Sequence, residues 1–490
     1  MSKNGNFEEE QKKTAEQAEQ NKANEQIESA AAEQGQNTEE REQTDANSPD
    51  AAQKGGVKKT SKSKRVLRGC AIGLALIATF FGGFFVHKAT LPSEINSLLW
   101  AKERIQKEYY EEIDDEAFFD AVFSGVDSLL DDYSGYMTKE EYEEVQTRAA
   151  GVFSGLGIYF SSRDEEGNER MSVSRVAGGS PAEEAEIEEG SRVVAFGLDT
   201  DAMTRSDSFS EFSQFLTTVE TGETFYLCEQ KYPYGEENER VVSVCKRSFV
   251  ENYVFYRSDV AAYSYSGKDG EERSTGKPLS CLSSDTAYIR LAQFNGNAAA
   301  EFDGAMARFK ADGKKNLVLD LRDNGGGDLN ILCSIASYFC KNSAEKEPIA
   351  ATAVYKDGDR TNFRAKANRY AEFFSNSSKI YVLADSGTAS ASECLLGVML
   401  DYGATSYENV CLCKRNNGAK TYGKGIMQTT RTRYPWTSEA IKLTTAQIFW
   451  PTSGTSIHGR GVLPQDGALQ TQEIVYGDAE IRAAIAILLG

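Results

Sequence analysis

Residues 379–397 read KIYVLADSGTASASECLLG, a short apolar run followed by small hydroxyl residues and then by a second apolar run. The first run has the composition of a buried strand and the second continues as an apolar helix, which excludes a flexible Ser/Ala linker. We therefore predict a strand-to-helix turn, where a serine near the helix N-terminus is exposed and backbone N–H groups can stabilise an oxyanion. On these residues alone, capping of the helix by a Ser or Thr hydroxyl is the favoured interpretation.

The segment beyond Lys277 alternates between strands and helices in the same way. Apolar runs predict buried strands at 287–294, 316–322 and 379–385, with helices at 298–313 and 330–340. Continuous apolar strands that alternate with helices imply a parallel-type sheet covered on both faces. Functional loops of such sheets lie at the carboxyl ends of the strands, where DNGGGDL (323–329) and DSGTASASE (385–393) both fall.

The chain has only two histidines, so a lysine is the favoured general base for any serine nucleophile in this sheet. His87 lies at the end of an apolar stretch, and a Ser/His/Asp mechanism would have to use His458. A lysine held in an apolar site can lose its proton near neutral pH. Lys424 stands between Gly423 and Gly425, which allow close backbone approach, and has apolar residues on either side of them. We expect Lys424 to be a buried amine.

The N-terminal part of the chain is predicted to be a tail and a membrane anchor. Residues 1–53 carry thirteen acidic and five basic side chains and cannot bury enough apolar surface to become ordered. A basic stretch precedes 18 uncharged, mostly apolar residues (69–86), and a cleaved signal peptide would normally start near residue 1. We predict a disordered cytoplasmic tail with a basic flank at 1–65 and one transmembrane helix at 66–87, with the rest of the chain outside the cytoplasm.

Two regions lie between the anchor and the predicted sheet. Residues 108–146 predict two helices around a turn, with Thr138 as an N-cap and Glu141 three residues later. From Val152 on, short strands and two short helices predict a compact module. The GLG at 155–157 precedes a strand and could bind the terminal carboxylate of a peptide through backbone N–H groups, although a bulge or turn explains GLG alone better.

Charge and cysteine spacing argue against a nucleic-acid partner, a disulfide framework and a metal site. The net charge is −20, and residues 88–490 carry nearly all of it, so the body would repel the phosphates of a nucleic acid. Eight of the nine cysteines lie beyond the apolar stretch and are scattered rather than arranged as a disulfide framework. Cys411 and Cys413 form a CxC, but no second cysteine pair or histidine cluster completes a metal site, so we expect both on one face of a strand.

Eight stretches over about residues 95–470 carry a family resemblance. In chain order they are GVDSLLDDYSGYMTKEEY, FSGLGIYF, SPAEEAEIEEGSRV, YIRLAQF, LVLDLRDNGGGDL, GTASASE, TYGKGIMQT and LTTAQIFWPTSGTSIHGRGVLPQD. Together they resemble the C-terminal processing peptidases, or tail-specific proteases, which are membrane-anchored or exported serine endopeptidases with a PDZ domain beside a catalytic serine/lysine pair. The resemblance implies a helical region at 93–148, an α+β PDZ domain at 150–250, an α/β catalytic domain at 251–475 with a mixed sheet and a crotonase/Clp-protease-like core, and a C-terminal helix at 476–490.

The resemblance also implies the residues of a catalytic site. The family's nucleophile falls on Ser390 and not on Ser392, its general base falls on Lys424, and the glutamine that orients the lysine falls on Gln428. In this mechanism unprotonated Lys424 takes the proton of Ser390, and the serine oxygen attacks the peptide carbonyl. No metal or other cofactor is required.

Binding residues are implied in the same way. The oxyanion donors would be the backbone N–H groups of Ala391 and Gly327. The PDZ carboxylate loop would be Gly155, Leu156, Gly157 and Ile158. Proteins or peptides with apolar C-terminal tails would be the substrates. Whether the helical region forms a homodimer and whether an activator protein is needed remain open at this point.

Alternatives and one departure accompany this assignment. The chain would be a membrane-tethered PDZ adaptor if the protease domain had become a scaffold, and a hydrolase of another type if Ser390 worked with His458. The connection from Ser390 to Lys424 is longer than is usual in the family, and SYENVCLCKRNNGAK (406–420) is the apparent insertion. We expect Arg322 and Asp323 to pair with each other or with neighbouring loops, without a role in proton transfer.

Overall fold

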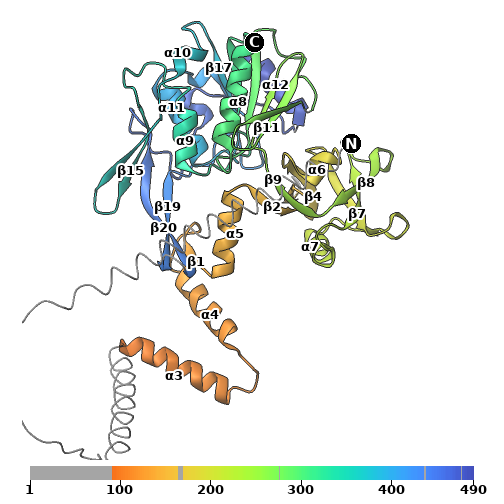
Figure 1. Cartoon of the computed structure of the whole chain (residues 1–490), viewed down its shortest axis with the longest axis vertical. Helices are drawn as coiled ribbons and strands as arrows, with labels where there is room; N and C mark the ends of the chain where they lie inside the picture. Colours follow the sequence, from red (N-terminus) through yellow and green to blue (C-terminus); the bar gives the residue numbers. More distant parts are fainter. Residues whose placement is uncertain (1–90, 164–168, 275, 435–436, 476, 490) are drawn as a thin grey trace, which may run out of the picture. The chain divides into compact units, whose positions relative to one another are not determined.

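The computed structural model describes residues 91–163, 169–274, 276–434, 437–475 and 477–489 (Figure 1). The predicted tail (1–65) and transmembrane helix (66–87) lie outside these ranges. Within them, no helix is both long enough and apolar enough to cross a membrane. The chain divides after Glu108, so helix α3 (Ser93–Glu108) belongs to one unit and residues 109–490 form another.

The second unit begins with a helical region that also contributes a strand. Helices α4 (Asp115–Asp127) and α5 (Lys139–Ala149) flank strand β1 (Gly135–Met137). The predicted capping box is confirmed: Thr138 Oγ1 accepts the N–H of Glu141 at 3.3 Å, and the Glu141 carboxylate accepts the N–H of Thr138 at 2.8 Å. The range predicted as a helical region, 93–148, holds α3, α4 and most of α5, with β1 between α4 and α5.

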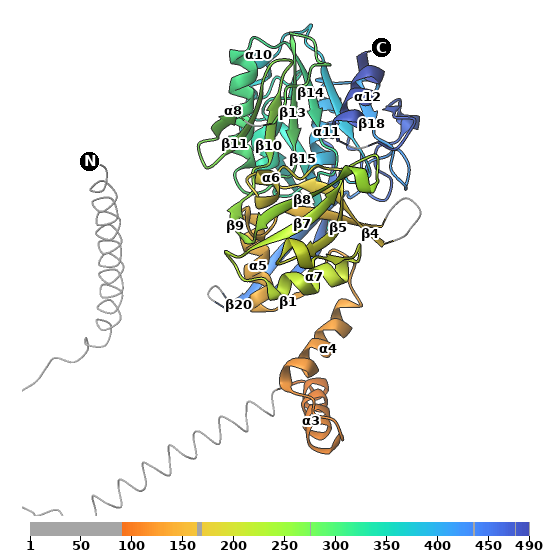
Figure 2. The same cartoon turned by 90° about the vertical axis from the view of Figure 1, so that its right-hand side faces the viewer.

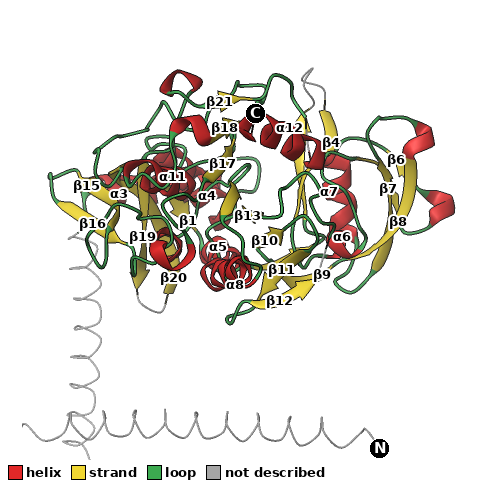
Figure 3. Ribbon diagram, turned by 90° about the horizontal axis from the view of Figure 1, so that it is seen from above, coloured by secondary structure: helices red, strands yellow, loops and turns green. Residues whose placement is uncertain are grey.

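A compact α+β module follows. Its strands and helices are β2 (Val152–Gly155), β3 (Ile158–Arg163), β4 (Glu169–Val176), α6 (Pro181–Glu184), β5 (Arg192–Gly197), β6 (Thr204–Arg205), α7 (Phe209–Thr218), β7 (Thr224–Gln230), β8 (Glu239–Cys245) and β9 (Arg247–Val250). The main sheet has the strand order β3-β4-β5-β7-β8, with β6 beside β5, and a separate ribbon joins β2 to β9. Helices α6 and α7 lie beside β7 and β8 (Figure 3). Buried Phe212 of α7 and Ala182 of α6 pack with Phe225 and Leu227 of β7.

The largest sheet of the chain forms the centre of the following domain. Its strand order is β12-β11-β10-β13-β14-β17-β18-β21. The strands are β10 (Val254–Arg257), β11 (Ala262–Ser266), β12 (Glu271–Ser274), β13 (Thr286–Leu291), β14 (Asn316–Asp320), β17 (Ile380–Ala384), β18 (Val410–Leu412) and β21 (Leu469–Gln470). From β13 to β21 every neighbouring pair is parallel, whereas β10, β11 and β12 are antiparallel. The predicted mixed α/β sheet is confirmed.

Helices cover both faces of this sheet. On one face, α8 (Ala298–Ala311), α9 (Leu329–Ala336) and α11 (Ala391–Asp401) pack against alternate residues of β13, β14 and β17, near the short helix α10 (Tyr370–Phe373). On the other face, α12 (Gly477–Leu489) packs against the intervening residues, among them Tyr288, Val318 and Leu383. Figure 2 shows α8 and α12 on opposite sides of β13 and β14. Burial on both faces explains why these strands are continuous apolar runs.

A second sheet joins the helical region to this domain. It contains β15 (Ile349–Tyr355), β16 (Arg360–Arg364), β19 (Ile426–Tyr434) and β20 (Thr437–Phe449) in the order β1-β20-β15-β16, with β19 also paired to β20. Strand β1 pairs antiparallel with residues 440–442 of β20. The helical region therefore supplies one strand of the sheet that also contains β19 and β20, the two strands after Lys424.

The segment interpreted as an insertion is part of the central sheet. Residues 406–420 contain β18, which pairs in parallel with β17 and β21. Cys411 and Cys413 are fully buried in one apolar cluster against α12, as expected for one face of a strand. The longer connection from Ser390 to Lys424 therefore contains a strand of the core and is not only a surface loop. All eight cysteines of the described ranges are free thiols.

Candidate active site

Ser390 lies on the turn between β17 and α11, directly before the first residue of the helix. Its backbone has φ 57° and ψ −117°, a conformation that residues with a β-carbon rarely adopt. The hydroxyl makes no capping hydrogen bond, so the capping interpretation fails for this residue. A strained strand-to-helix turn of this kind presents a serine side chain at the carboxyl end of a sheet.

The neighbouring hydroxyls have structural roles. Thr388 Oγ1 donates to the carbonyl of Leu321 at 2.7 Å and accepts the N–H of Asp385 at 2.9 Å. Ser392 Oγ donates to the carbonyl of Asn324 at 2.9 Å. Both side chains are fully buried, whereas Ser390 is partly exposed. The structure therefore leaves Ser390, and not Ser392, accessible for chemistry.

The glycine-rich loop after β14 lies directly against Ser390. A Cβ added to Gly326 would lie 2.8 Å from Ser390 Cβ and 2.8 Å from the backbone nitrogen of Ala391. Asn324 ties the two loops together, because its carbonyl accepts the N–H of Ala389 at 2.9 Å and its Oδ1 accepts the N–H of Gly326 at 3.0 Å. Glycine is required at position 326 both by its φ of 96° and by this contact.

The two predicted oxyanion donors have unused N–H groups. Gly327 forms a parallel bridge with Phe294, whose hydrogen bonds use the carbonyl of Gly326 and the N–H of Asp328. Ala391 is the first residue of α11, and such a residue has no intrahelical acceptor for its N–H. Within the described ranges neither N–H donates to a backbone carbonyl. Gly326, rather than Gly327, makes the close contact with Ser390.

Lys424 lies on the loop before β19 and is held against the Ser390 turn by its backbone. The N–H of Tyr422 donates to the carbonyl of Thr388 at 2.9 Å. An added Cβ would meet the backbone nitrogen of Arg460 at 2.9 Å on Gly423 and that of His458 at 2.8 Å on Gly425. The expected close backbone approach at these two glycines is confirmed.

Glu393 connects the two predicted catalytic residues, and sequence reasoning missed it. Its buried carboxylate accepts the N–H of Ser390 at 3.1 Å, of Lys424 at 2.9 Å and of Gly423 at 2.8 Å, and the hydroxyl of Thr421 at 2.6 Å. Burial raises the pKa of this carboxyl, and the four hydrogen bonds act in the opposite direction. An acid three residues after an N-cap position was the available signal, because such a side chain can accept the N–H of the N-cap residue.

The Lys424 amine lies over an aromatic ring from the helical region. Its Nζ is 4.2 Å from the centroid of Tyr133, a residue of the loop between α4 and β1. Burial lowers the pKa of the amine, the charge of Lys442 lowers it further, and Asp131 acts in the opposite direction. Within the described ranges, the Ser390 and Lys424 side chains are not hydrogen-bonded to each other.

Two other predicted participants make different contacts. Gln428 lies on β19, and its Nε2 donates to Thr444 Oγ1 at 2.9 Å rather than to Lys424. His458 is exposed and approaches the site only through its backbone at Gly425, and no contact with Ser390 is seen in the described part of the chain. The geometry favours a lysine over a histidine as the partner of Ser390.

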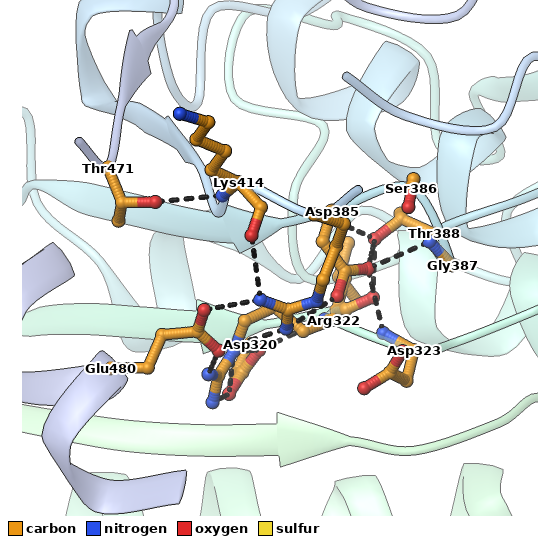
Figure 4. A network of polar contacts seen from close by, with 12 residues as sticks. Asp320, Arg322, Asp323, Asp385, Ser386, Gly387, Thr388, Lys414, Thr471 and Glu480 are labelled. Atoms are coloured by element: carbon orange, nitrogen blue, oxygen red, sulfur yellow. Dashed lines mark hydrogen bonds and ion pairs between the residues drawn. The ribbon is translucent and has the colours of Figure 1, made fainter. Parts of the chain in front are cut away.

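A buried ionic network holds the ends of β14 and β17 in place (Figure 4). Arg322 binds Asp320 through Nε, at 2.9 and 3.0 Å from the two carboxylate oxygens, and also pairs with Glu480 of α12. Arg415 connects Glu480 to Asp385, its Nη2 lying 2.9 Å from Asp385 Oδ2. The network thus links α12 to the strand end that precedes Ser390.

Asp385, a member of this network, is also hydrogen-bonded to both loops of the site. Its Oδ1 accepts the N–H of Asp323 at 2.9 Å and of Gly387 at 3.0 Å. Burial and the negative charge of Asp385 raise the pKa of Asp323 to about 6, although Arg415 opposes the shift. Arg322 pairs with Asp320 and Glu480, and Asp323 is bound to Asp385 through its backbone N–H. In the described part of the chain no ion pair joins Arg322 to Asp323.

The four residues of the predicted carboxylate loop lie at one edge of the α+β module. The carbonyls of Leu156 and Gly157 accept the N–H groups of Ala182 at 3.0 Å and Ala177 at 2.8 Å. Gly157 has φ 78°, and an added Cβ would lie only 2.2 Å from the Cβ of Ser180. Gly155 ends β2 and Ile158 begins β3, which is an edge strand of the sheet as described.

A strained serine, a lysine and a glycine-rich loop at the carboxyl end of a mixed α/β sheet are the features of a serine-type hydrolase. Residues 285–466 match the family model described as Peptidase family S41. Over this part of the chain the protein is similar to the S41 peptidases.

Individual proteins that resemble this chain share less than a third of its residues. A probable CtpA-like serine protease of Staphylococcus haemolyticus (strain JCSC1435) is 27% identical over 376 residues, which cover 76% of this chain and 64% of that protein, less than two thirds of its length. A solved photosystem II D1 C-terminal processing protease is 22% identical, with 82% of this chain and 98% of that chain covered and a TM-score of 0.45. A solved putative S41 protease from Bacteroides fragilis is 18% identical, with 78% of this chain and 90% of that chain covered and a TM-score of 0.47.

Proposed function

We propose that the protein is a membrane-anchored serine endopeptidase that cleaves protein substrates outside the cytoplasm with Ser390 as nucleophile and Lys424 as general base. The observation that carries this proposal is the single Glu393 carboxylate, which binds the backbone N–H groups of both residues. This contact fixes the two chain segments relative to each other. The strained Ser390 backbone and the adjacent Gly326 support the same assignment.

The chemistry follows from these positions. The neutral amine of Lys424 takes the proton of Ser390 Oγ while the oxygen attacks the carbonyl carbon of the substrate. The N–H groups of Ala391 and Gly327 stabilise the oxyanion that forms. The Lys424 ammonium then returns the proton to the leaving amine, and water hydrolyses the acyl-enzyme with the neutral lysine again acting as base. Burial of Lys424 supports this role because it lowers the pKa of the amine.

The α+β module fits the role of a PDZ domain that captures the C-terminal tail of a substrate. Strand β3 is an edge strand, so an extended peptide could add to it through main-chain hydrogen bonds. The adjacent loop supports binding of the terminal carboxylate, because among the described residues the N–H groups of Leu156 and Gly157 donate no backbone hydrogen bond. Phe160 of β3 packs against Phe209 and Phe212 of α7, which supports a preference for apolar tails.

Membrane anchoring rests on the sequence. The apolar stretch at 66–87 follows a basic flank, and positive charge is retained on the cytoplasmic side. Residues after Lys88 would therefore lie outside the cytoplasm. Protease protection of the full-length protein in intact cells and in opened membranes tests this arrangement, since a cytoplasmic catalytic domain would be protected from external protease in intact cells.

Cleavage of an unfolded model protein with an apolar C-terminus tests the activity. The full-length chain, Ser390→Ala and Lys424→Ala are compared from pH 6 to pH 10, with His458→Ala as the control for the histidine alternative. We expect cleavage that rises with pH, is abolished by the first two substitutions and persists in His458→Ala. Tail binding without cleavage at any pH would instead indicate a membrane-tethered PDZ adaptor.

A further inference from the structure

The helical region before the α+β module reaches the proposed general base. Strand β1 extends β20, with Tyr136 opposite Ile441, and the Oγ of Ser134 accepts the N–H of Thr444 at 2.8 Å. These contacts fix the loop 131–134 beside the hairpin that follows Lys424. The loop is therefore part of the wall around the lysine and not only a connection between α4 and β1.

Tyr133 contacts the lysine loop at two points. Its ring centroid lies 4.2 Å from Lys424 Nζ, and its hydroxyl lies 2.8 Å from the hydroxyl of Tyr422 in a hydrogen bond. Tyr422 precedes Lys424 by two residues and is itself bound through its N–H to the carbonyl of Thr388 on the nucleophile turn. Across the described part of the chain, Lys424 Nζ donates no hydrogen bond, so the ring is the group that holds the amine.

We propose that Tyr133 is the positioning residue of Lys424: its ring face holds the amine, and its hydroxyl holds the Tyr422 end of the same loop. This inference rests on the proposed function. A lysine side chain has four rotatable bonds, and without the ring the amine would leave its place beside the nucleophile turn more often. The helical region would thus determine how often the base is correctly placed.

The ring also acts on the protonation of the amine. The charged or titratable groups around Lys424 are Lys442 on β20, Asp131, Asp132 and Tyr133 on the α4–β1 loop, Tyr422 on its own loop, and Glu393 at its backbone N–H. The hydrogen bond to Tyr422 and burial raise the pKa of Tyr133 to about 12, so its ring stays neutral. A neutral aromatic face stabilises an ammonium group. Loss of the ring should therefore lower the pKa of Lys424 and extend activity to lower pH.

Kinetics on the full-length chain test this inference. For Tyr133→Leu we expect the acid limb of the kcat profile to move down by about half a pH unit or more. The plateau kcat should fall about tenfold, and KM should change less than kcat. Tyr133→Phe keeps the ring and should keep the position of the acid limb. Tyr110→Leu is the matched control, because Tyr110 belongs to the same region and is 84% exposed. A fall in kcat without movement of the limb would overturn the proposal.

A second readout separates this inference from the proposed function. In a Ser390→Ala background, competitive labelling with acetic anhydride across pH 6 to 10, read by mass spectrometry, reports the pKa and accessibility of Lys424 without catalysis. Faster labelling of Lys424 and a lower pKa in Tyr133→Leu, with an unchanged reference lysine such as Lys346, support the inference even if no cleavage is found. Identical labelling with and without the ring would overturn it, even if Ser390 and Lys424 prove essential for cleavage.

Discussion

The nucleophile turn and the lysine loop are held in different ways. The turn 385–390 is fixed by its own residues and by the adjacent loop 323–327, through buried hydrogen bonds of Asp385, Thr388 and Asn324. The Lys424 loop depends on distant segments: Glu393, the 457–462 segment and Tyr133. The Ser390 turn is thus held by buried hydrogen bonds to one neighbouring loop, whereas the Lys424 loop is held by contacts from three separate segments.

The largest expected loss of activity comes from a substitution at Gly326, which contacts the Ser390 turn. Gly326→Ala places a methyl group 2.8 Å from the carbonyl oxygen of Ala389 and from Ser390 Cβ, at a φ of 96°. The backbone must shift, so we expect kcat/KM to fall about 10²-fold or more. Gly325→Ala is the matched control, since no atom lies within 4 Å of its added Cβ. Equal activity of the two variants would show that the loop does not constrain Ser390.

A substitution at Glu393 should disturb the Ser390 turn and the Lys424 loop together. Glu393→Gln replaces one acceptor oxygen with an NH₂ group that faces backbone donors. The NH₂ group leaves the N–H of Gly423 without an acceptor if it replaces Oε1, and those of both Ser390 and Lys424 if it replaces Oε2. We expect kcat to fall at least about tenfold, with stability reduced by about 1–3 kcal/mol. The exposed Glu408→Gln serves as control. Unchanged kcat in a less stable Glu393→Gln protein would show that Glu393 has a folding role alone.

A substitution in the ionic network should lower the stability of the protein without changing the position of Lys424. Glu480→Gln weakens the pairing of two buried arginines, Arg322 and Arg415, and we expect a loss of about 3 kcal/mol in the free energy of unfolding. Urea denaturation measures this loss, with the exposed Glu473→Gln as control. The acid limb of the pH–rate profile should stay in place, because Glu480 does not contact Lys424. A displaced limb would connect α12 to the base and weaken the comparison.

The last expected effect is confined to a window of pH and is due to Asp323. Its folded-state pKa of about 6 lies above the value of about 4 for an unfolded chain, so the native state holds the proton more tightly. The stability contributed by this group is complete below about pH 4 and is lost as pH rises to about 6, by at most about 3 kcal/mol. Asp323→Asn removes this dependence and tolerates the positive φ of 54°. Parallel stability curves for the two proteins between pH 4 and 7 would contradict this assignment.

The sequence by itself determined the features that depend on near neighbours. Apolar runs and glycine positions predicted the parallel strands, the turn at Ser390 and the close approach at Gly423 and Gly425. The capping box at Thr138 was also predicted correctly. Each of these signals acts over a few residues, through the strand or helix period or through backbone conformation.

Only the tertiary structure decided the partners of these elements. The spacing of Cys411 and Cys413 predicted a strand, but the place of β18 between β17 and β21 became visible only in the fold. The same holds for β1, which is recognised by its pairing with β20. The hydrogen bond between Tyr133 and Tyr422 joins residues 289 positions apart. Such contacts follow from how whole elements pack, which no local pattern encodes. The sequence therefore predicted the turn that carries Ser390, and the fold decided what surrounds Lys424.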